Sequence, residues 1–174
     1  MPRTPPPSRF DYQRFAEIGT RWDDNDIYGH LNNTVHYRIF DTVINSFLLE
    51  QGILDFRDGE QVFLIIETGC QYFAELAYPD KIDAGYRVAH LGTSSVRYEI
   101  GLFRQGEDSA AAAGHFIHVN AEVDRGVPRW AEVGRGGPWW AEVGRGEPMG
   151  SRGGRGAARR GEGGEGGDVG EGEE

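Results

Sequence analysis

The sequence predicts an α+β domain in which one long helix is buried against an antiparallel sheet of about five strands. One segment has the apolar period of a helix, and four later segments have the pattern of strands. Short turns join those strands in succession, as expected for hairpins, because parallel strands would need long crossovers. A chain of 174 residues is long enough for one ordinary domain with a core.

Residues 1–9 are expected to form a flexible arm, because four of them are prolines. Proline fits neither a helix interior nor a central strand. Order is therefore expected to begin near Phe10. Phe15 to Trp22 is interpreted as the first strand, with Phe15, Ile18 and Trp22 as its apolar anchors.

The helix is predicted from Asn33 to about Gln51. Asn32 or Asn33 can cap its first turn through a side-chain oxygen, and Gly52 stands just past its end. Apolar residues recur along it in steps of three and four, which places them on one buried face: Val35, Ile39, Phe40, Val43, Ile44, Phe47 and Leu48.

The four later strands are separated by short connections rich in turn-forming residues. In the third of them, apolar residues alternate with polar ones or glycine, as in a half-buried antiparallel strand. The predicted ranges are Gln61–Leu76, Lys81–Leu91, Ser95–Arg104 and Ala111–Val123.

Composition excludes several classes of function. The net charge of −10 disfavours general binding of nucleic acid. Cys70 is the one cysteine, which excludes an internal disulfide and a zinc site with several cysteines. No apolar run is long enough to span a membrane, and the N-terminus lacks the apolar core of a secretory signal. We therefore expect a cytoplasmic protein without a metal or other cofactor.

A ten-residue repeat marks the end of the predicted domain, which covers residues 10–129. The sequences 125–134 and 135–144 both end in Ala-Glu-Val-Gly, and a degraded third copy follows. So few copies, each with proline and glycine, cannot build a repeat core. Residues 130–174 are therefore expected to be a disordered tail, although Trp130, Trp139 and Trp140 could dock on a partner or on the domain.

A polar segment, Asp24 to Asn33, stands between the first predicted strand and the helix. The carboxylates of Asp24 and Asp26 could form Asx turns while Asn32 and Asn33 cap the helix, a purely structural role. A calcium loop is disfavoured because Val35 stands where a bidentate glutamate is needed. A metal site is also disfavoured, because His30 and His36 are six residues apart and no metal-ligand spacing recurs in the sequence.

A resemblance gives this segment a function. Residues 21–37 read RWDDNDIYGHLNNTVHY. The segment resembles the R-W-x-D-x-D-x-x-G-H-x-N-N signature of the 4-hydroxybenzoyl-CoA thioesterase-like family, which has the hotdog fold. The likeness continues more loosely through Tyr72-Phe73, residues 90–95 and residues 120–124, so it covers about Phe10 to Arg129.

This resemblance implies an acyl-CoA thioesterase in which Asp26 attacks the thioester carbonyl or activates a water molecule. It also implies an oxyanion contact from a backbone N–H near Asn33, which is chemically reasonable because the first turn of a helix has free N–H groups. His30 could face the substrate or only hold the loop. Glu67 could reach the site from its strand, or it could be a solvated strand residue.

Coenzyme A carries phosphates, so an acidic protein must bind them with local donors. The candidates are Tyr28 and Asn32 near the loop, Arg87, Arg97, and the turn formed by Thr93, Ser94 and Ser95. Ordinary surface arginines are the structural alternative. The resemblance also implies self-association as a dimer or tetramer. The competing function is a hotdog protein that binds acyl-CoA or a related ligand without catalysis.

Overall fold

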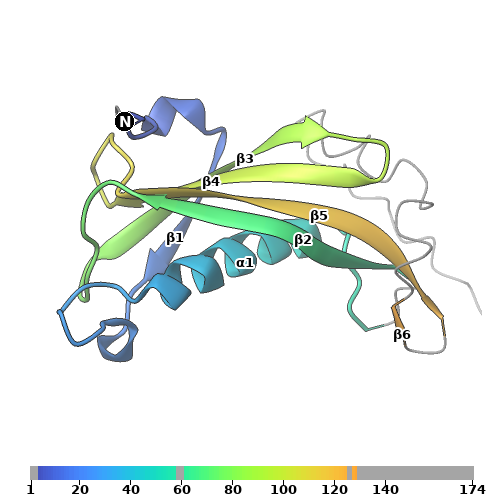
Figure 1. The fold of residues 1–174 in the computed structure, drawn as a ribbon, viewed down its shortest axis with the longest axis horizontal. Coiled ribbons are helices and arrows are strands. Elements are labelled where there is room, and N and C mark those ends of the chain that lie inside the picture. Colours follow the sequence, from blue (N-terminus) through green and yellow to red (C-terminus); the bar gives the residue numbers. More distant parts are fainter. Residues whose placement is uncertain (1–3, 58–60, 125–126, 129–174) are drawn as a thin grey trace, which may run out of the picture.

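A computed structural model describes residues 4–57, 61–124 and 127–128. In those residues a long helix lies across one face of an antiparallel sheet whose strand order is β1-β3-β4-β5-β2, with β6 paired to β5 (Figure 1). This arrangement confirms the predicted fold class. One predicted hairpin is wrong, because β2 pairs with β5 at the edge of the sheet and not with β3, which follows it in the chain. The elements are η1 (Arg9–Asp11), β1 (Arg14–Gly19), η2 (Trp22–Asp24), α1 (Asn33–Glu50), β2 (Gln61–Tyr72), β3 (Lys81–Leu91), β4 (Ser95–Arg104), β5 (Ala112–Asp124) and β6 (Val127–Pro128).

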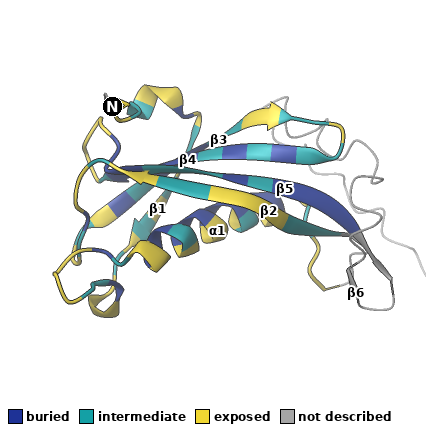
Figure 2. Ribbon diagram, in the orientation of Figure 1, coloured by how far each residue is buried: buried dark blue, intermediate teal, exposed yellow. Residues whose placement is uncertain are grey.

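Helix α1 begins and ends close to the predicted positions. Asn32 is its N-cap, and Gly52 follows its end with a φ of 66°, a conformation that glycine adopts without strain. All seven apolar residues of the predicted face are buried. Figure 2 shows this buried face turned toward the sheet, while the opposite side of α1 is exposed. The core therefore lies between α1 and the central strands.

Strand β5 passes very close to the helix at Gly114. A Cβ atom there would lie 2.4 Å from the ring of Phe40 and 2.4 Å from the carbonyl oxygen of Gly69. Real Cβ atoms do not approach other atoms so closely, and Phe40 is fully buried. The absence of a side chain at Gly114 therefore allows the helix and the sheet to pack together.

The first strand is shorter than predicted. β1 ends at Gly19, and Trp22 begins the 3₁₀ helix η2 with 81% of its surface exposed, so it does not anchor the strand. Phe15 lies 6.0 Å from Phe103 between ring centroids and is itself 40% exposed. Ile18 packs on the core as predicted, and Ala16 packs there with it, because side chains of a strand alternate between its two faces.

Two other boundaries differ from the prediction. Strand β2 stops at Tyr72, and the N–H groups of Phe73 and Ala74 both donate to the carbonyl of Ala111 in a loop. At the N-terminus, order begins before Phe10. The carbonyl of Pro7 accepts the N–H of Ala110, so this part of the arm is held against the sheet.

The predictions for residues 130–174, including the tryptophan repeats, lie outside the described residues. Within the described part of the chain, no helix is long and apolar enough to cross a membrane.

Candidate active site

Residues 24–32, called the site loop below, fold back on themselves before α1 begins. The N–H of Asn32 donates to the carbonyl of Asp24 at 2.9 Å, and the N–H of Asp26 donates to the carbonyl of His30 at 2.8 Å. Gly29 stands in the turn with a φ of 82°. This conformation favours glycine, so the local sequence selects the turn.

The carboxylate of Asp26 holds the tip of the site loop. Its Oδ1 accepts the N–H of Tyr28 at 2.8 Å and the N–H of His30 at 3.2 Å. Within the described residues Oδ2 accepts no hydrogen bond, and the side chain is half-buried. Asp26 therefore forms the Asx turn considered from the sequence and still has one carboxylate oxygen available to a ligand or water.

Asp24 has a different environment, although it is only two residues away. It is 4% exposed, and its carboxylate accepts the N–H of Arg21 at 2.7 Å and pairs with the guanidinium of Arg38 on α1. These contacts fix the site loop onto the helix. A buried, fully paired carboxylate is suited to a structural role.

A second loop, residues 73–80, supports the site loop from the other side. The carbonyl of Leu76 accepts the N–H of Leu31 at 2.6 Å, and the side-chain oxygen of Asn25 accepts the N–H of Tyr78 at 2.9 Å. Nε2 of His30 lies 3.2 Å from Oε2 of Glu75, which places His30 in a contact that holds the loop. Sequence reasoning missed Glu75, because no local pattern relates these two loops.

The start of α1 lies directly after the site loop. Oδ1 of Asn32 accepts the N–H of Thr34 at 3.0 Å and its hydroxyl at 2.9 Å, so Asn32 is a helix cap. Asn33 is the first helical residue and is exposed, and its N–H belongs to the donors that have no partner within a helix. The positive end of the helix dipole adds to the attraction of this turn for negative charge.

His36 also holds this first turn, a role that sequence reasoning did not assign. It is buried, and Nδ1 lies 3.1 Å from the carbonyl oxygen of Asn32. Burial lowers the pKa of His36, so the neutral ring is favoured, with Nδ1–H donating to that carbonyl. The ring of Tyr72 packs edge-on against it, with centroids 4.9 Å apart.

Glu67 lies on the face of the sheet away from α1. Its Oε1 is 2.9 Å from Nε2 of His115 and 3.8 Å from a nitrogen of Arg97. Gly114 faces the helix, so the adjacent residue His115 faces the opposite way. The structure of one protomer thus places Glu67 in an ion-pair group on the sheet, not beside the site loop.

Of the predicted phosphate-binding residues, Tyr28 and Asn32 belong to the site loop, but the arginines and the serine-rich turn do not. Arg87 donates to Oε2 of Glu99 at 2.7 and 3.0 Å and to the carbonyl of Asp11 at 2.9 Å. Thr93, Ser94 and Ser95 occupy the β3–β4 turn, at the opposite end of the long axis from the site loop (Figure 1). A role for these residues in binding coenzyme A stays a prediction.

A thiolate nucleophile and a bound metal ion are two other groups that can act at such a site. Burial raises the pKa of Cys70, which favours the neutral thiol over the nucleophilic thiolate. Among the described residues, no group of three or more His, Cys, Asp and Glu side chains could hold a metal ion. Beside the site loop, Oδ2 of Asp26 and the N–H of Asn33 are the polar groups described above that have no hydrogen-bond partner within the described residues.

Residues 20–136 match the thioesterase-like superfamily, and this range includes the site loop and all of α1. The chain belongs to the thioesterase-like superfamily. The chain matches none of the curated proteins.

Solved structures similar to this superfamily member include the PA5185 protein from Pseudomonas aeruginosa strain PAO1. That protein is 49% identical over 71% of this chain and 87% of its own, with a TM-score of 0.68. The PA2801 protein from the same species is 26% identical over 66% of this chain and 90% of its own, with a TM-score of 0.58. The DHNA-CoA thioesterase from Staphylococcus aureus is 17% identical over 74% and 86%, with a TM-score of 0.61, a likeness that shows the fold alone.

Proposed function

We propose that this protein hydrolyses acyl-CoA thioesters to a carboxylic acid and coenzyme A, with Asp26 as the catalytic carboxylate. The observation that carries the proposal is the position of Asp26, whose Oδ1 is held by two backbone N–H groups while Oδ2 is available. In one route the carboxylate attacks the thioester carbonyl and expels the thiolate of coenzyme A, and water then hydrolyses the anhydride. In the other, the carboxylate takes a proton from the attacking water, whose oxygen displaces the thiolate. Both routes need the same fixed, ionised group.

The N–H of Asn33 supports the second part of the proposal. Attack on a thioester places negative charge on the carbonyl oxygen, and a donor at the start of a helix stabilises that charge without reorganisation. One such donor is worth roughly 10²–10³ in rate. Asn32 and His36 fix the turn that carries this N–H, through the cap and the Nδ1–H hydrogen bond.

Self-association is the further part of the proposal. Ile65 and Ile66 on β2, at the end of the strand order, are 40% and 53% exposed. At the tip of the site loop, Ile27 is 91% and Tyr28 is 77% exposed. Apolar side chains exposed in this number favour contact with a second copy. We propose a dimer or tetramer, which light scattering on the purified chain would test.

The decisive experiment compares Asp26→Asn with Asp23→Asn. Asparagine at position 26 keeps a side-chain oxygen for the two N–H groups, so the loop is retained while the charge is lost. Asp23 is an exposed neighbour in η2 and serves as the matched control. Hydrolysis of short, medium, long and aromatic acyl-CoA substrates is followed with a thiol dye.

We expect Asp26→Asn to lose at least about 10²-fold in kcat/KM, the lower end for a general base, with an unchanged Tm. Asp23→Asn should retain wild-type rates. Equal rates for the two variants would remove Asp26 from the mechanism. Stabilisation by a non-hydrolysable CoA analogue without turnover of any thioester would instead support the non-catalytic binding function.

A further inference from the structure

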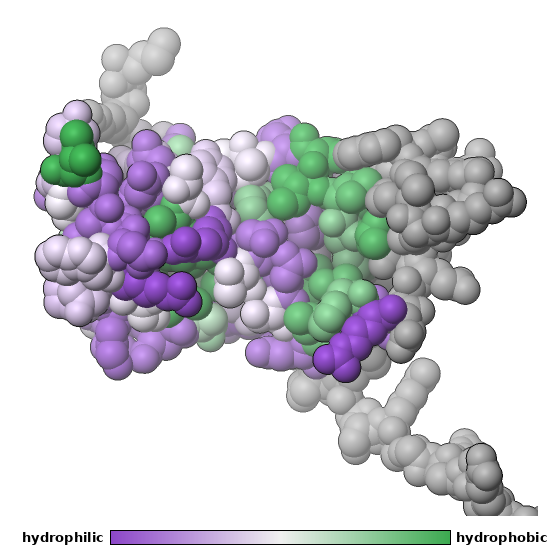
Figure 3. All heavy atoms as spheres, turned by 90° about the horizontal axis from the view of Figure 1, so that it is seen from below, coloured by the Kyte–Doolittle hydropathy of each residue, from purple (hydrophilic) through white to green (hydrophobic). Residues whose placement is uncertain are grey.

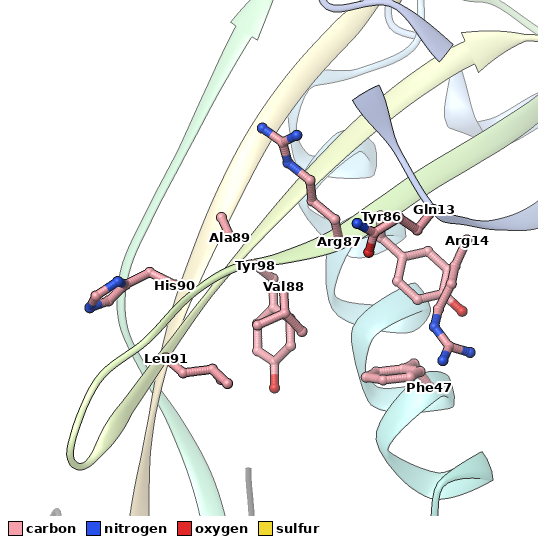
Figure 4. A pocket seen from close by; sticks show the side chains of 10 residues that line it. All are labelled: Gln13, Arg14, Phe47, Tyr86, Arg87, Val88, Ala89, His90, Leu91 and Tyr98. Carbon is pink, nitrogen blue, oxygen red and sulfur yellow. The ribbon is translucent and has the colours of Figure 1, made fainter. Parts of the chain in front are cut away.

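A cavity of about 390 Å³ lies between the C-terminal part of α1 and the end of strand β3 (Figure 4). This volume falls within the range of about 300–1,000 Å³ that is usual for small-molecule sites. Phe47 borders the cavity near the end of α1, whereas Asn33 begins that helix. A rise of 1.5 Å per residue separates the two by about 20 Å, so the cavity is distinct from the site loop.

The wall of the cavity combines three aromatic residues with aliphatic and polar ones, and Arg87 and His90 are among the polar members. The rings of Phe47 and Tyr86 are tilted against each other with centroids 5.5 Å apart, and Tyr98 lies on the neighbouring strand β4. Val88 and Leu91 complete the apolar lining. Seen from the helix side, hydrophobic surface gathers toward this end of the molecule, while the other end is mainly hydrophilic (Figure 3). The aromatic part of the wall suits a flat ring, and the polar part suits charged or hydroxyl groups on that ring.

Tyr98 adds a polar group to this apolar surface. This residue is 0% exposed, and its hydroxyl has no hydrogen-bond partner among the residues that the structure describes. Figure 4 shows the hydroxyl directed between Leu91 and Phe47. Buried hydroxyls almost always have a partner, and leaving one unpaired costs free energy. A ligand with a polar group at this depth would supply the partner by displacing the half-buried side chain of Leu91.

Arg14 supplies a positive charge at the same cavity. Its guanidinium carbon lies 5.1 Å from the centroid of the Phe47 ring, and the side chain forms no ion pair within the described part of the chain. Burial raises the pKa of Tyr86, the negative charge of Glu50 raises it further, and the positive charge of Arg14 lowers it. Glu50 therefore places a negative charge near the cavity. Because Glu50 is near but forms no ion pair with Arg14 in the described part of the chain, the guanidinium can bind a carboxylate of a ligand.

We propose that this cavity is a second binding site, which takes an aromatic carboxylate carrying a hydroxyl on its ring. The carboxylate binds Arg14, the ring packs among Phe47, Tyr86 and Tyr98, and the ligand hydroxyl bonds to the hydroxyl of Tyr98. Glu50 opposes the carboxylate and limits the affinity. The site does not use Asp26 and does not depend on the proposed hydrolysis.

The test is calorimetric titration of the full chain with a hydroxynaphthoate and with naphthoate itself. Arg14→Gln should weaken both ligands about tenfold or more, the effect expected for a lost charge-assisted hydrogen bond. Tyr98→Phe should weaken the hydroxynaphthoate severalfold and leave naphthoate unchanged. Glu50→Gln should tighten both ligands.

Arg57→Gln is the matched control, because Arg57 also lies over a phenylalanine ring, that of Phe56, but outside the cavity. It should bind both ligands as the wild type does. The proposal is overturned if neither ligand saturates at millimolar concentration, or if Arg14→Gln and Arg57→Gln bind equally. Equal losses for both ligands in Tyr98→Phe would also overturn it, because they would show a packing role and not a hydrogen bond.

Discussion

Replacing Arg38 by alanine should destabilise the protein through the carboxylate that Arg38 pairs with. The Asp24 side chain is 5% exposed, whereas that of Arg38 is 57% exposed. Without Arg38, the buried carboxylate retains the N–H of Arg21 as a partner. Breaking a fully buried pair costs about 3–5 kcal/mol, and a fully exposed pair is worth about 0–1 kcal/mol.

The Arg38 pair lies between these limits, because water can partly replace an exposed guanidinium but reaches the carboxylate poorly. We expect Arg38→Ala to lower the free energy of unfolding by about 2 kcal/mol. The carbonyl of Asp24 also accepts the N–H of Asn32, so loosening this carboxylate should reduce turnover of thioesters as well.

Urea unfolding of the full chain measures this effect, with Lys81→Ala as the matched control. Lys81 pairs with Glu17 at 3.2 Å, and both side chains are more than half exposed. That variant should change stability by less than about 0.5 kcal/mol. In an Asp24→Asn background, Arg38→Ala should cost less than in the wild type, because no buried charge remains. Equal effects of Arg38→Ala and Lys81→Ala would refute the reasoning.

Two further predictions concern the core. Gly114→Ala should lower the free energy of unfolding by about 3 kcal/mol, because its Cβ would meet the ring of Phe40 and a backbone oxygen. Gly19→Ala is the control and should be tolerated, because nothing lies within 4 Å of the added Cβ. Equal Tm values for the two variants would contradict the close approach at Gly114. Burial lowers the pKa of His118 from 6.5 to about 4, so the unfolded chain binds more protons between these values. The stability from neutral His118 is complete above pH 6.5 and is lost toward pH 4, by about 1.4 kcal/mol per pH unit. A His118→Phe variant should show a shallower fall in unfolding experiments across this range, and an unchanged slope would exclude His118 as the group.

Several elements were predictable because their signals are local. The period of apolar residues defined α1, and Asn32 and Gly52 marked its ends through interactions within a few residues. β3 and β4 have their predicted bounds, since turn-forming residues separate them. The first strand was overextended, because Trp22 is apolar but lies exposed in η2, where it contacts the ring of Tyr78.

The site loop was also predictable in its local features and not in its distant contacts. Its turn, Gly29 and the capping asparagine depend on neighbours in the sequence, so the pattern from Asp24 to Asn33 indicated a structured loop before a helix. The difference between the two carboxylates depends on Arg38 and on the loop of residues 73–80. Glu67 could be assigned to a strand, but only the pairing of that strand placed it beside His115.

The sequence by itself determined the helix, the hairpins of β3, β4 and β5 and the loop that carries Asp26, because spacing and turn chemistry act over a few residues. The predicted thioesterase-like character came from the resemblance of that loop to a known family. Tertiary structure alone decided that Asp24 is buried while one oxygen of Asp26 remains available, and that Arg14, Phe47 and Tyr98 border one cavity. These arrangements join residues far apart in the chain, and strand register and helix packing set them, which no local pattern encodes.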